Sequence, residues 1–394
     1  MNPKLPIIIL PHFLKPSLVA GHPWVYRDHV PKNFSAPNGT WVKIKAGNWS
    51  AYALWDTASP IALRVFSQRR RPDAKWVATR VQAAWALRAI IREQQQTTAY
   101  RWLFGEADGL PGITVDLYGS YAVLLTYAAS LNRIVPWVVQ ALHHTASLDG
   151  IVQRVSGTDK KKTGKINCLW GRMPPRDLII EEHGLRVRAN LYEGQKTGLF
   201  IDHRENRRYL EPFTRGRRVL NLFSYSAAFS LYAARGGAIQ SVSVDISPGA
   251  AIDARENFLL NGFDLDAHEF VVADVFDYLE TLRVQKRRFD LVICDPPSFA
   301  RNKQQLPQAL KAYTRLNAMA MRVTEPGGLY AAASCTSQVS PDTFRTLLAD
   351  AARQAGRRFQ LIHDAAHPPD HPVLAQHMEG RYLKFMVGRV ESIW

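Results

Sequence analysis

Strand-like and helix-like runs alternate through the last two hundred residues, and this alternation constrains the fold more than any other feature. From about residue 193 onward, an amphipathic segment of helix length follows each strand-like run, and the runs are VLNLF, SVSVDI, EFVVAD, LVICD, LYAAAS, FQLIHD and the closing RYLKFMVGRV. Such alternation is typical of a doubly wound, mainly parallel sheet with its ligand site at the carboxyl ends of the strands. We therefore predict an α/β, Rossmann-like domain with a seven-stranded sheet over residues 193–394.

Two further segments precede this domain. Residues 1–71 are rich in Pro, Gly and Trp and contain short β-type runs such as TWVKIKAG and SAYALWD, which predict a small β-barrel. Residues 72–192 combine a helical stretch with the alternating runs GITVDLYGSYAVLLTYA and GLRVRANLYEG, so we expect a central α+β domain there. A chain of 394 residues is long enough for two or three separate cores.

Charge and composition narrow the class of protein. The formal net charge is +16, and the Lys and Arg residues are spread along the whole chain, which favours broad surfaces that face a polyanion. No apolar run reaches the roughly 18 residues of a membrane span, and MNPKLPIIILPHF is too short and too interrupted by Pro for a signal peptide. The three cysteines lack the spacing of a disulfide framework or a metal site. We therefore expect a cytoplasmic protein without a metal ion.

The loop after the first strand of the last domain indicates the cofactor. A dinucleotide-binding fold would carry G-x-G-x-x-G there, whereas residues 223–228 contain no glycine. The second strand ends in Asp245, where a carboxylate can hold two ribose hydroxyls, and the third ends in Asp274, placed to accept from an adenine amino group. A nucleoside held without a phosphate cradle fits S-adenosylmethionine better than NAD or ATP. The alternative is that both aspartates cap the following helices.

The sequence GTDKKKTGK is not a phosphate-binding P-loop. Six residues separate Gly157 from Gly164 where that motif has four, and Ile166 follows the lysine where Ser or Thr should stand. Lys160–Lys162 and Lys165 then form either a basic loop for phosphates or a solvated loop.

Several motifs, in their order, resemble one enzyme family. HPWVY (22–26), DGLPGITVDLYG (108–119) and EGQKTGLFIDHRENR (193–207), followed by SVDIS, CDPPSF and SCTS, resemble the bacterial 23S rRNA cytosine-C5 methyltransferases that carry an N-terminal PUA domain. The resemblance covers nearly the whole chain. It implies a PUA barrel, a central segment and a class I S-adenosylmethionine-dependent catalytic domain, with 23S rRNA or a large-subunit assembly intermediate as the partner. The resemblance does not determine the oligomeric state, and a homodimer is one of the alternatives.

The resemblance also assigns the cofactor residues. The family's first motif is similar to D-x-F-x-Y-T-G-G-F and aligns with residues 221–229. An amide stands in place of the acid, Ser226 in place of Thr, and Ala227-Ala228 in place of two glycines. The cofactor site is then expected to contain the matching loop residues and the strand-end acids with their neighbours, namely Asn221, Phe223, Tyr225, Ala227, Asp245, Ile246, Asp274, Val275 and Asp295.

The expected chemistry follows from the target ring. C5 of cytosine is a poor nucleophile, so a thiolate must first add to C6 and load electron density onto C5. Cys335, at the end of a buried strand, is the candidate thiol, and Asp295 would hold the N3/N4 edge of a flipped base. Cys294 points to the opposite side of its strand from Asp295 and is expected in the core.

Other residues are expected to contact the RNA. The Pro296-Pro297 turn would fix Asp295, and Phe299 would stack on the flipped base. By analogy with relatives, Lys196, Arg204 and Arg207 would contact RNA phosphates or orient the cofactor, the alternative being a solvated helix start.

Two rival functions stay open on the sequence alone. A purine rRNA methyltransferase of the related DPP-S/T-F type differs mainly in lacking the thiol. A non-catalytic RNA-binding paralogue would have lost the cofactor through the Ala227-Ala228 loop.

Overall fold

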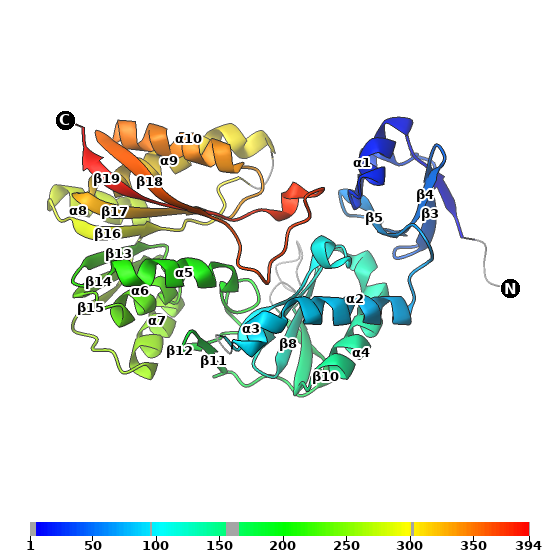
Figure 1. Cartoon of the computed structure of the whole chain (residues 1–394), viewed down its shortest axis with the longest axis horizontal. Helices are drawn as coiled ribbons and strands as arrows, with labels where there is room; N and C mark the ends of the chain where they lie inside the picture. Colours follow the sequence, from blue (N-terminus) through cyan, green and yellow to red (C-terminus); the bar gives the residue numbers. More distant parts are fainter. Residues whose placement is uncertain (1–4, 95–96, 155–164, 301–302, 394) are drawn as a thin grey trace. The chain divides into compact units, whose positions relative to one another are not determined.

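A computed structural model describes residues 5–94, 97–154, 165–300 and 303–393 (Figure 1). Its contacts divide the chain into two compact units. Unit 1 contains Met1–Ile180, Ala189–Ile201 and Pro369–Gly380, and unit 2 contains Glu181–Arg188, Asp202–Pro368 and Arg381–Trp394. The predicted basic residues Lys160–Lys162 lie outside the described residues, whereas Lys165 is exposed. The division at residues 71 and 192 stays a prediction.

The first part of unit 1 is a five-stranded sheet in the order β1-β3-β4-β5-β2, antiparallel except for the pair β1 and β3. Its strands are β1 (Ile7–Ile9), β2 (Trp24–Tyr26), β3 (Trp41–Ala46), β4 (Trp49–Trp55) and β5 (Ile61–Ser67). Short helical segments connect them, namely η1 (His12–Leu14), α1 (Lys15–Val19) and η2 (Arg27–His29). Ile44, Ala53 and Leu63 are fully buried and belong to one apolar core.

A second five-stranded sheet, in the order β10-β9-β8-β7-β6, completes most of unit 1. Its strands are β6 (Ala99–Phe104), β7 (Ile113–Tyr118), β8 (Tyr121–Thr126), β9 (Gly150–Arg154) and β10 (Ile166–Gly171). The helical segments are α2 (Ala74–Leu87), α3 (Ala89–Glu93), η3 (Gly105–Asp108), η4 (Ala129–Arg133) and α4 (Val135–Thr145). Asp73 starts α2 because its carboxylate accepts from the backbone N–H of Trp76 at 2.7 Å. The short strands β11 (Ile179–Glu182) and β12 (Leu185–Arg188) pair with each other.

Unit 2 has the predicted seven-stranded sheet. Its order is β15-β14-β13-β16-β17-β19-β18, and all neighbours are parallel except β19 with β17 and with β18. The strands are β13 (Arg218–Leu222), β14 (Gln240–Asp245), β15 (His268–Val272), β16 (Phe289–Cys294), β17 (Thr324–Ser334), β18 (Arg357–Ala365) and β19 (Lys384–Ser392). The short 3-10 segments associated with this part of the chain are η5 (Ile201–His203), η6 (Glu211–Phe213), η7 (Lys303–Gln305) and η8 (Met378–Gly380).

Helices cover both faces of this sheet (Figure 1). One face carries α5 (Arg204–Leu210), α6 (Ala228–Arg235) and α7 (Pro248–Leu260), and the other carries α8 (Val275–Val284), α9 (Leu306–Arg322) and α10 (Pro341–Gln354). Successive residues of β13 pack on opposite faces, so that Val219 and Leu220 lie in different apolar cores. Within the described residues, no helix is both long enough and apolar enough to cross a membrane.

Candidate active site

The loop that joins β13 to α6 has an unusual backbone. Phe223, Tyr225 and Ala227 all have positive φ, at 58°, 47° and 57°. A left-handed conformation costs a residue with a Cβ roughly 1–2 kcal/mol, and such strain is often found at functional sites. The backbone turns so that the N–H of Tyr225 donates to Asp245 Oδ2 at 2.9 Å. The loop is therefore tied to the end of β14.

The two strand-end acids have different roles in the structure. Asp245 Oδ1 accepts from the backbone N–H of Ser247 at 2.9 Å, and Ser247 itself caps α7. Asp274 is the cap of α8, because its Oδ1 accepts from the N–H groups of Phe276 at 2.8 Å and Asp277 at 3.4 Å. The capping alternative thus holds for Asp274 and not for Asp245.

The carboxyl end of β14 suits a nucleoside. Asp245 is partly exposed and is held by two backbone N–H groups, which orient its carboxylate for ribose hydroxyls. Ile246 beside it is 70% exposed, and Val272, paired with Asp245 at the end of β15, is 49% exposed. Exposed apolar side chains next to a fixed carboxylate match an adenine ring and a ribose, so the donor set fits S-adenosylmethionine. Val275 is buried in the core below.

Asn221 belongs to a buried polar network. Its side chain is 1% exposed, and its Nδ2 donates to Ser230 Oγ at 3.0 Å. The Ser230 and Ser243 hydroxyls are 2.7 Å apart. The Asn221 amide therefore fastens β13 to α6 and, through Ser230, to β14.

Asp295 lies at the carboxyl end of β16 beside a histidine. His203 Nε2 is 3.4 Å from Asp295 Oδ2, and their side chains are 2% and 18% exposed. His203 Nδ1 is 3.1 Å from the Asn206 amide nitrogen, so an N–H of that amide donates to it and Nε2 carries the ring proton. Nε2 makes no hydrogen bond among the described residues, and its approach to Asp295 is an ion-pair distance. The sequence analysis missed His203, although it lies within the motif EGQKTGLFIDHRENR.

Cys335 follows the last residue of β17, the strand next to β16. Its Sγ is 4.0 Å from the carbonyl oxygen of Pro296, and its side chain is partly exposed. Cys294 is fully buried, as expected, and burial raises the pKa of its thiol to about 12. The structure thus brings Asp295, the Pro296 carbonyl and Cys335 to one edge of the sheet, with Cys294 inside the core.

A buried lysine lies next to Cys335. Lys384, the first residue of β19, pairs in register with Ser334 and is 1% exposed. Its Nζ donates to the carbonyl oxygens of Tyr382, at 2.8 Å, and Thr336. Burial lowers the pKa of Lys384 to about 8, and interaction with Cys335 acts in the opposite direction. The sequence signal was a lysine inside the apolar run YLKFMV, a position where Lys is rarely found without partners.

The double-proline turn is followed by an aromatic pair. The rings of Phe299 and Tyr313 lie 4.6 Å apart and tilted, and both residues belong to the core that covers this face of the sheet. Pro296 is buried and Pro297 is exposed. Phe299 is partly buried, so a fraction of its ring stays accessible.

Two of the three basic residues predicted in the EGQKTGLFIDHRENR motif, Arg204 and Arg207, differ from the expectation, and Lys196 does not. Arg207 is 4% exposed and makes two hydrogen bonds to Glu182, at 2.8 and 2.7 Å. Arg204 is 1% exposed, and its Nε donates to Glu205 at 3.0 Å. These guanidiniums do not face solvent, because folding pairs them with carboxylates, and we place no phosphate contact on them. Lys196, in unit 1, is exposed with its Nζ 4.3 Å from the centre of the Phe200 ring.

A mainly parallel sheet with this strand order and one antiparallel strand, together with a carboxylate at the end of its second strand, is typical of a class I S-adenosylmethionine-dependent methyltransferase. Models of known families match residues 154–385 as an S-adenosylmethionine-dependent methyltransferase and residues 8–68 as a PUA-like domain. The chain is 36% identical to "Ribosomal RNA large subunit methyltransferase I" of Yersinia pestis over 97% of this chain and 99% of that protein.

Two solved structures have a similar fold over nearly the whole chain. A methyltransferase complexed with SAH has a TM-score of 0.87 at 25% identity, over 98% of this chain and 100% of that one. A methyltransferase from Streptococcus mutans has the same TM-score at 24% identity, with the same coverage. The chain belongs to the family of S-adenosylmethionine-dependent methyltransferases that carry an N-terminal PUA-like domain.

Proposed function

We propose that this methyltransferase modifies C5 of a cytosine in large-subunit ribosomal RNA through a transient bond from Cys335 to C6 of the base. One observation carries the proposal: a partly exposed thiol ends β17 beside the buried cation of Lys384 and the turn that follows Asp295. The name of the Yersinia relatives, which share 36% identity along the whole chain, supports the choice of RNA. A purine methyltransferase would have no use for this pair of thiol and cation.

In this mechanism the cofactor supplies an electrophilic methyl group. The Cys335 thiolate would form a C–S bond to C6, and the electron pair of the C5=C6 bond would move to C5. With the cofactor bound, C5 would take the methyl group while the sulfonium–methyl bond breaks and its electron pair stays on the departing thioether sulfur. A base removes the proton from C5, the C5=C6 bond forms again, and the C–S bond breaks to release the thiolate. Asp295 accepts from the N4 amino group and holds the flipped base during these steps.

Two buried side chains prepare the reacting groups. His203 Nε2 lies 3.4 Å from Asp295 Oδ2, close enough for a small shift on substrate binding to make a hydrogen bond that orients this carboxylate. The positive charge of Lys384 favours the thiolate form of Cys335. We assign both as positioning residues, because each acts through the side chain beside it.

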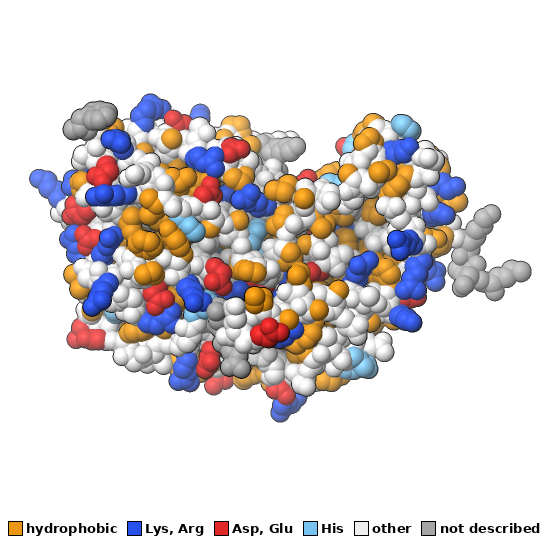
Figure 2. Space-filling view, viewed as in Figure 1, with side chains coloured by type: hydrophobic (Ala, Val, Ile, Leu, Met, Phe, Trp, Pro, Cys, Tyr) orange, Lys and Arg blue, Asp and Glu red, His pale blue; other side chains and the backbone are white. Residues whose placement is uncertain are grey.

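RNA binding is supported by charge. The chain has a net charge of +16, and Lys and Arg side chains are scattered over the face drawn in Figure 2. A cavity of about 630 Å³ in unit 2 is lined largely by cations, namely Arg283, Lys286, Arg287, Arg288, Arg322 and Arg357. Since β16, β17 and β18 begin beside it, this cavity lies at the edge of the sheet opposite Cys335. We propose that it binds RNA phosphates away from the target base.

We also propose a domain organisation for the chain. Residues 1–71 form the PUA-like RNA-binding domain, residues 72–192 a central domain and residues 193–394 the catalytic domain, which the matches to residues 8–68 and 154–385 support in part. The substrate is 23S rRNA or an assembling large subunit in the cytoplasm. A homodimer is an open alternative that light scattering would test.

A trapping experiment tests the reaction. RNA that carries 5-fluorocytosine at the target should remain covalently attached to the wild-type enzyme in the presence of cofactor, because fluorine does not leave from C5 as a proton does. Cys335→Ala should neither trap nor methylate, whereas Cys294→Ala should do both. Methylation of a purine without an adduct, or continued methylation by Cys335→Ala, would show that the proposal is wrong.

A further inference from the structure

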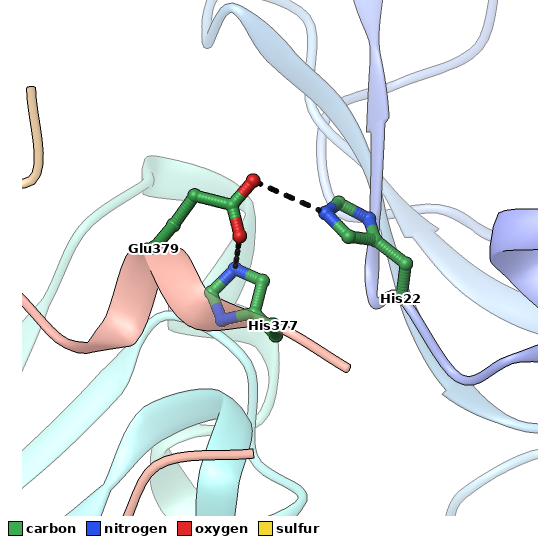
Figure 3. A group of neighbouring side chains, drawn as sticks. All are labelled: His22, His377 and Glu379. Atoms are coloured by element: carbon green, nitrogen blue, oxygen red, sulfur yellow. Dashed lines mark ion pairs between the residues drawn. The ribbon is translucent and has the colours of Figure 1, made fainter. Parts of the chain in front are cut away.

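Three potential metal ligands from opposite ends of the chain meet in unit 1 (Figure 3). His22 lies between α1 and β2, whereas His377 and Glu379 lie at the 3-10 turn η8. His22 Nε2 is 3.6 Å from Glu379 Oε1, and His377 Nε2 is 3.8 Å from Glu379 Oε2. One atom from each residue lies within 4.8 Å of the other two. Both imidazoles thus point at one carboxylate.

His377 lacks a hydrogen bond that its burial would require. The residue is 3% exposed, and its Nε2 has no hydrogen-bond partner within the described parts of the chain. An unsatisfied polar atom at such a depth is unfavourable, and bonding to a ligand removes this penalty.

The surrounding structure fixes the two imidazoles. His22 Nδ1 is 3.3 Å from both the nitrogen and the carbonyl oxygen of Trp24, so the ring is held in either tautomer. Trp24 Nε1 in turn donates to Glu106 at 2.8 Å, and the Trp24 and His377 ring centres are 4.2 Å apart. Metal-binding histidines need such support on the far side of the ring. Both imidazoles are therefore supported by their surroundings, and the exposed Glu379 is the ligand free to adjust.

We propose that His22, His377 and Glu379 bind one divalent transition-metal ion of the zinc class. Bonds of about 2.0–2.2 Å place two donors of a tetrahedral zinc ion about 3.4 Å apart. The two imidazole–carboxylate distances need shifts of only a few tenths of an ångström, and the donor atoms of the two imidazoles, which lie within 4.8 Å of each other, approach further when the ion binds. Two imidazoles and a carboxylate favour zinc-class ions over Mg²⁺ or Ca²⁺. The ion ties the segment before β2 to the turn η8 and stabilises unit 1. The sequence did not reveal this site because its ligands come from distant positions in the chain.

Metal titration of the full-length protein tests the proposal. After removal of bound metal with a chelator, the wild type should bind one equivalent of Zn²⁺ or Co²⁺, with the Co²⁺ complex showing visible d–d absorption. Glu379→Gln and His22→Ala should lower the affinity at least ~100-fold, because each removes a ligand. Glu379 is exposed, so its amide variant should fold and keep the measurement interpretable.

Two controls make the result specific. His29→Ala removes a second histidine near the barrel whose Nδ1 lies 3.7 Å from Asp28 without a third ligand, and His144→Ala disrupts the adjacent His143 and His144 rings on α4. Both variants should retain the one equivalent, and Zn²⁺ should raise their Tm as it does that of the wild type. The absence of stoichiometric binding by the wild type, or equal binding by Glu379→Gln, would overturn the proposal. The 5-fluorocytosine experiment is independent of this outcome.

Discussion

His203 Nε2 lies 3.4 Å from Asp295 Oδ2, which joins a buried imidazole of the 3-10 segment η5 to the acid that follows β16. The rings of Phe229 and Phe385 pack around His203, with ring centres 5.5 and 5.8 Å from its own. These apolar neighbours leave the carboxylate as the polar group that its Nε2 faces. At this distance His203 can orient the carboxylate of Asp295.

We therefore expect loss of this contact to slow catalysis more than it weakens cofactor binding. His203→Gln should lower the single-turnover rate of methylation by about 10- to 100-fold, since Asp295 would no longer be fixed. Calorimetric titration with S-adenosylmethionine should give a nearly unchanged affinity for the same variant. The exposed residue His144 provides a control, and His144→Gln should match the wild type. An unaltered rate for His203→Gln would remove the positioning role.

The second prediction concerns the reactivity of Cys335. If the Lys384 cation favours the thiolate, Lys384→Met should move the pH midpoint for alkylation of Cys335 upward by about one unit. Rates of iodoacetamide modification against pH, measured in a Cys168→Ser background, give this midpoint. Lys384→Arg keeps the charge and should restore part of the shift. A midpoint that is the same in all three proteins would contradict the assignment.

The third prediction follows from the pKa of Lys384 itself. Burial lowers this pKa from 10.5 to about 8, so between these pH values the unfolded chain binds one more proton than the folded chain. The free energy of unfolding therefore rises with pH in this window, and the destabilisation due to the buried charge is fully present below pH 8. Denaturant titrations measure this effect. Between pH 8 and 10.5 the free energy of unfolding of the wild type should rise by about 2–3 kcal/mol relative to that of Lys384→Met. A constant difference would show that Lys384 titrates normally.

Strands β16 and β17 could be read from the sequence because each contains a continuous apolar run, which is typical of a sheet covered on both faces, whereas β15 and β18 are largely accessible to solvent. Asp295 and Cys335 could be found for the same reason, since they follow such runs directly. His203 and Lys384 could not be found from the sequence, because their roles depend on contacts between distant parts of the chain. The burial of Arg207 could not be predicted for a related reason, because its ion-pair partner Glu182 lies on a separate short strand.

The fourth prediction uses two adjacent alanines. Ala227 has a φ of 57°, so Ala227→Gly should relieve strain and raise stability by about 0.5–1 kcal/mol, less the loss of one buried methyl group. Ala228 is the first residue of α6, so Ala228→Gly should lower stability by about 0.5–1 kcal/mol. Urea unfolding measures both, and equal effects of the two substitutions would contradict the left-handed backbone at Ala227.

The fifth prediction concerns the basic cavity of unit 2. Burial and the nearby Arg288 lower the pKa of Arg357, and the Nε of Arg357 has no hydrogen-bond partner among the described residues. Such crowding of like charges is relieved by an anion.

If RNA phosphates bind there, the double variant Arg288→Gln, Arg357→Gln should weaken RNA binding and reduce the slope of log affinity against log salt by about 0.7–2. Fluorescence anisotropy at several salt concentrations measures this slope. Arg345→Gln, which removes an arginine that is paired with Asp342 and Asp364 on another surface, should leave it unchanged. Equal slopes for the double variant and the wild type would mean that RNA does not reach this cavity, and the net charge would then have to act through other surfaces.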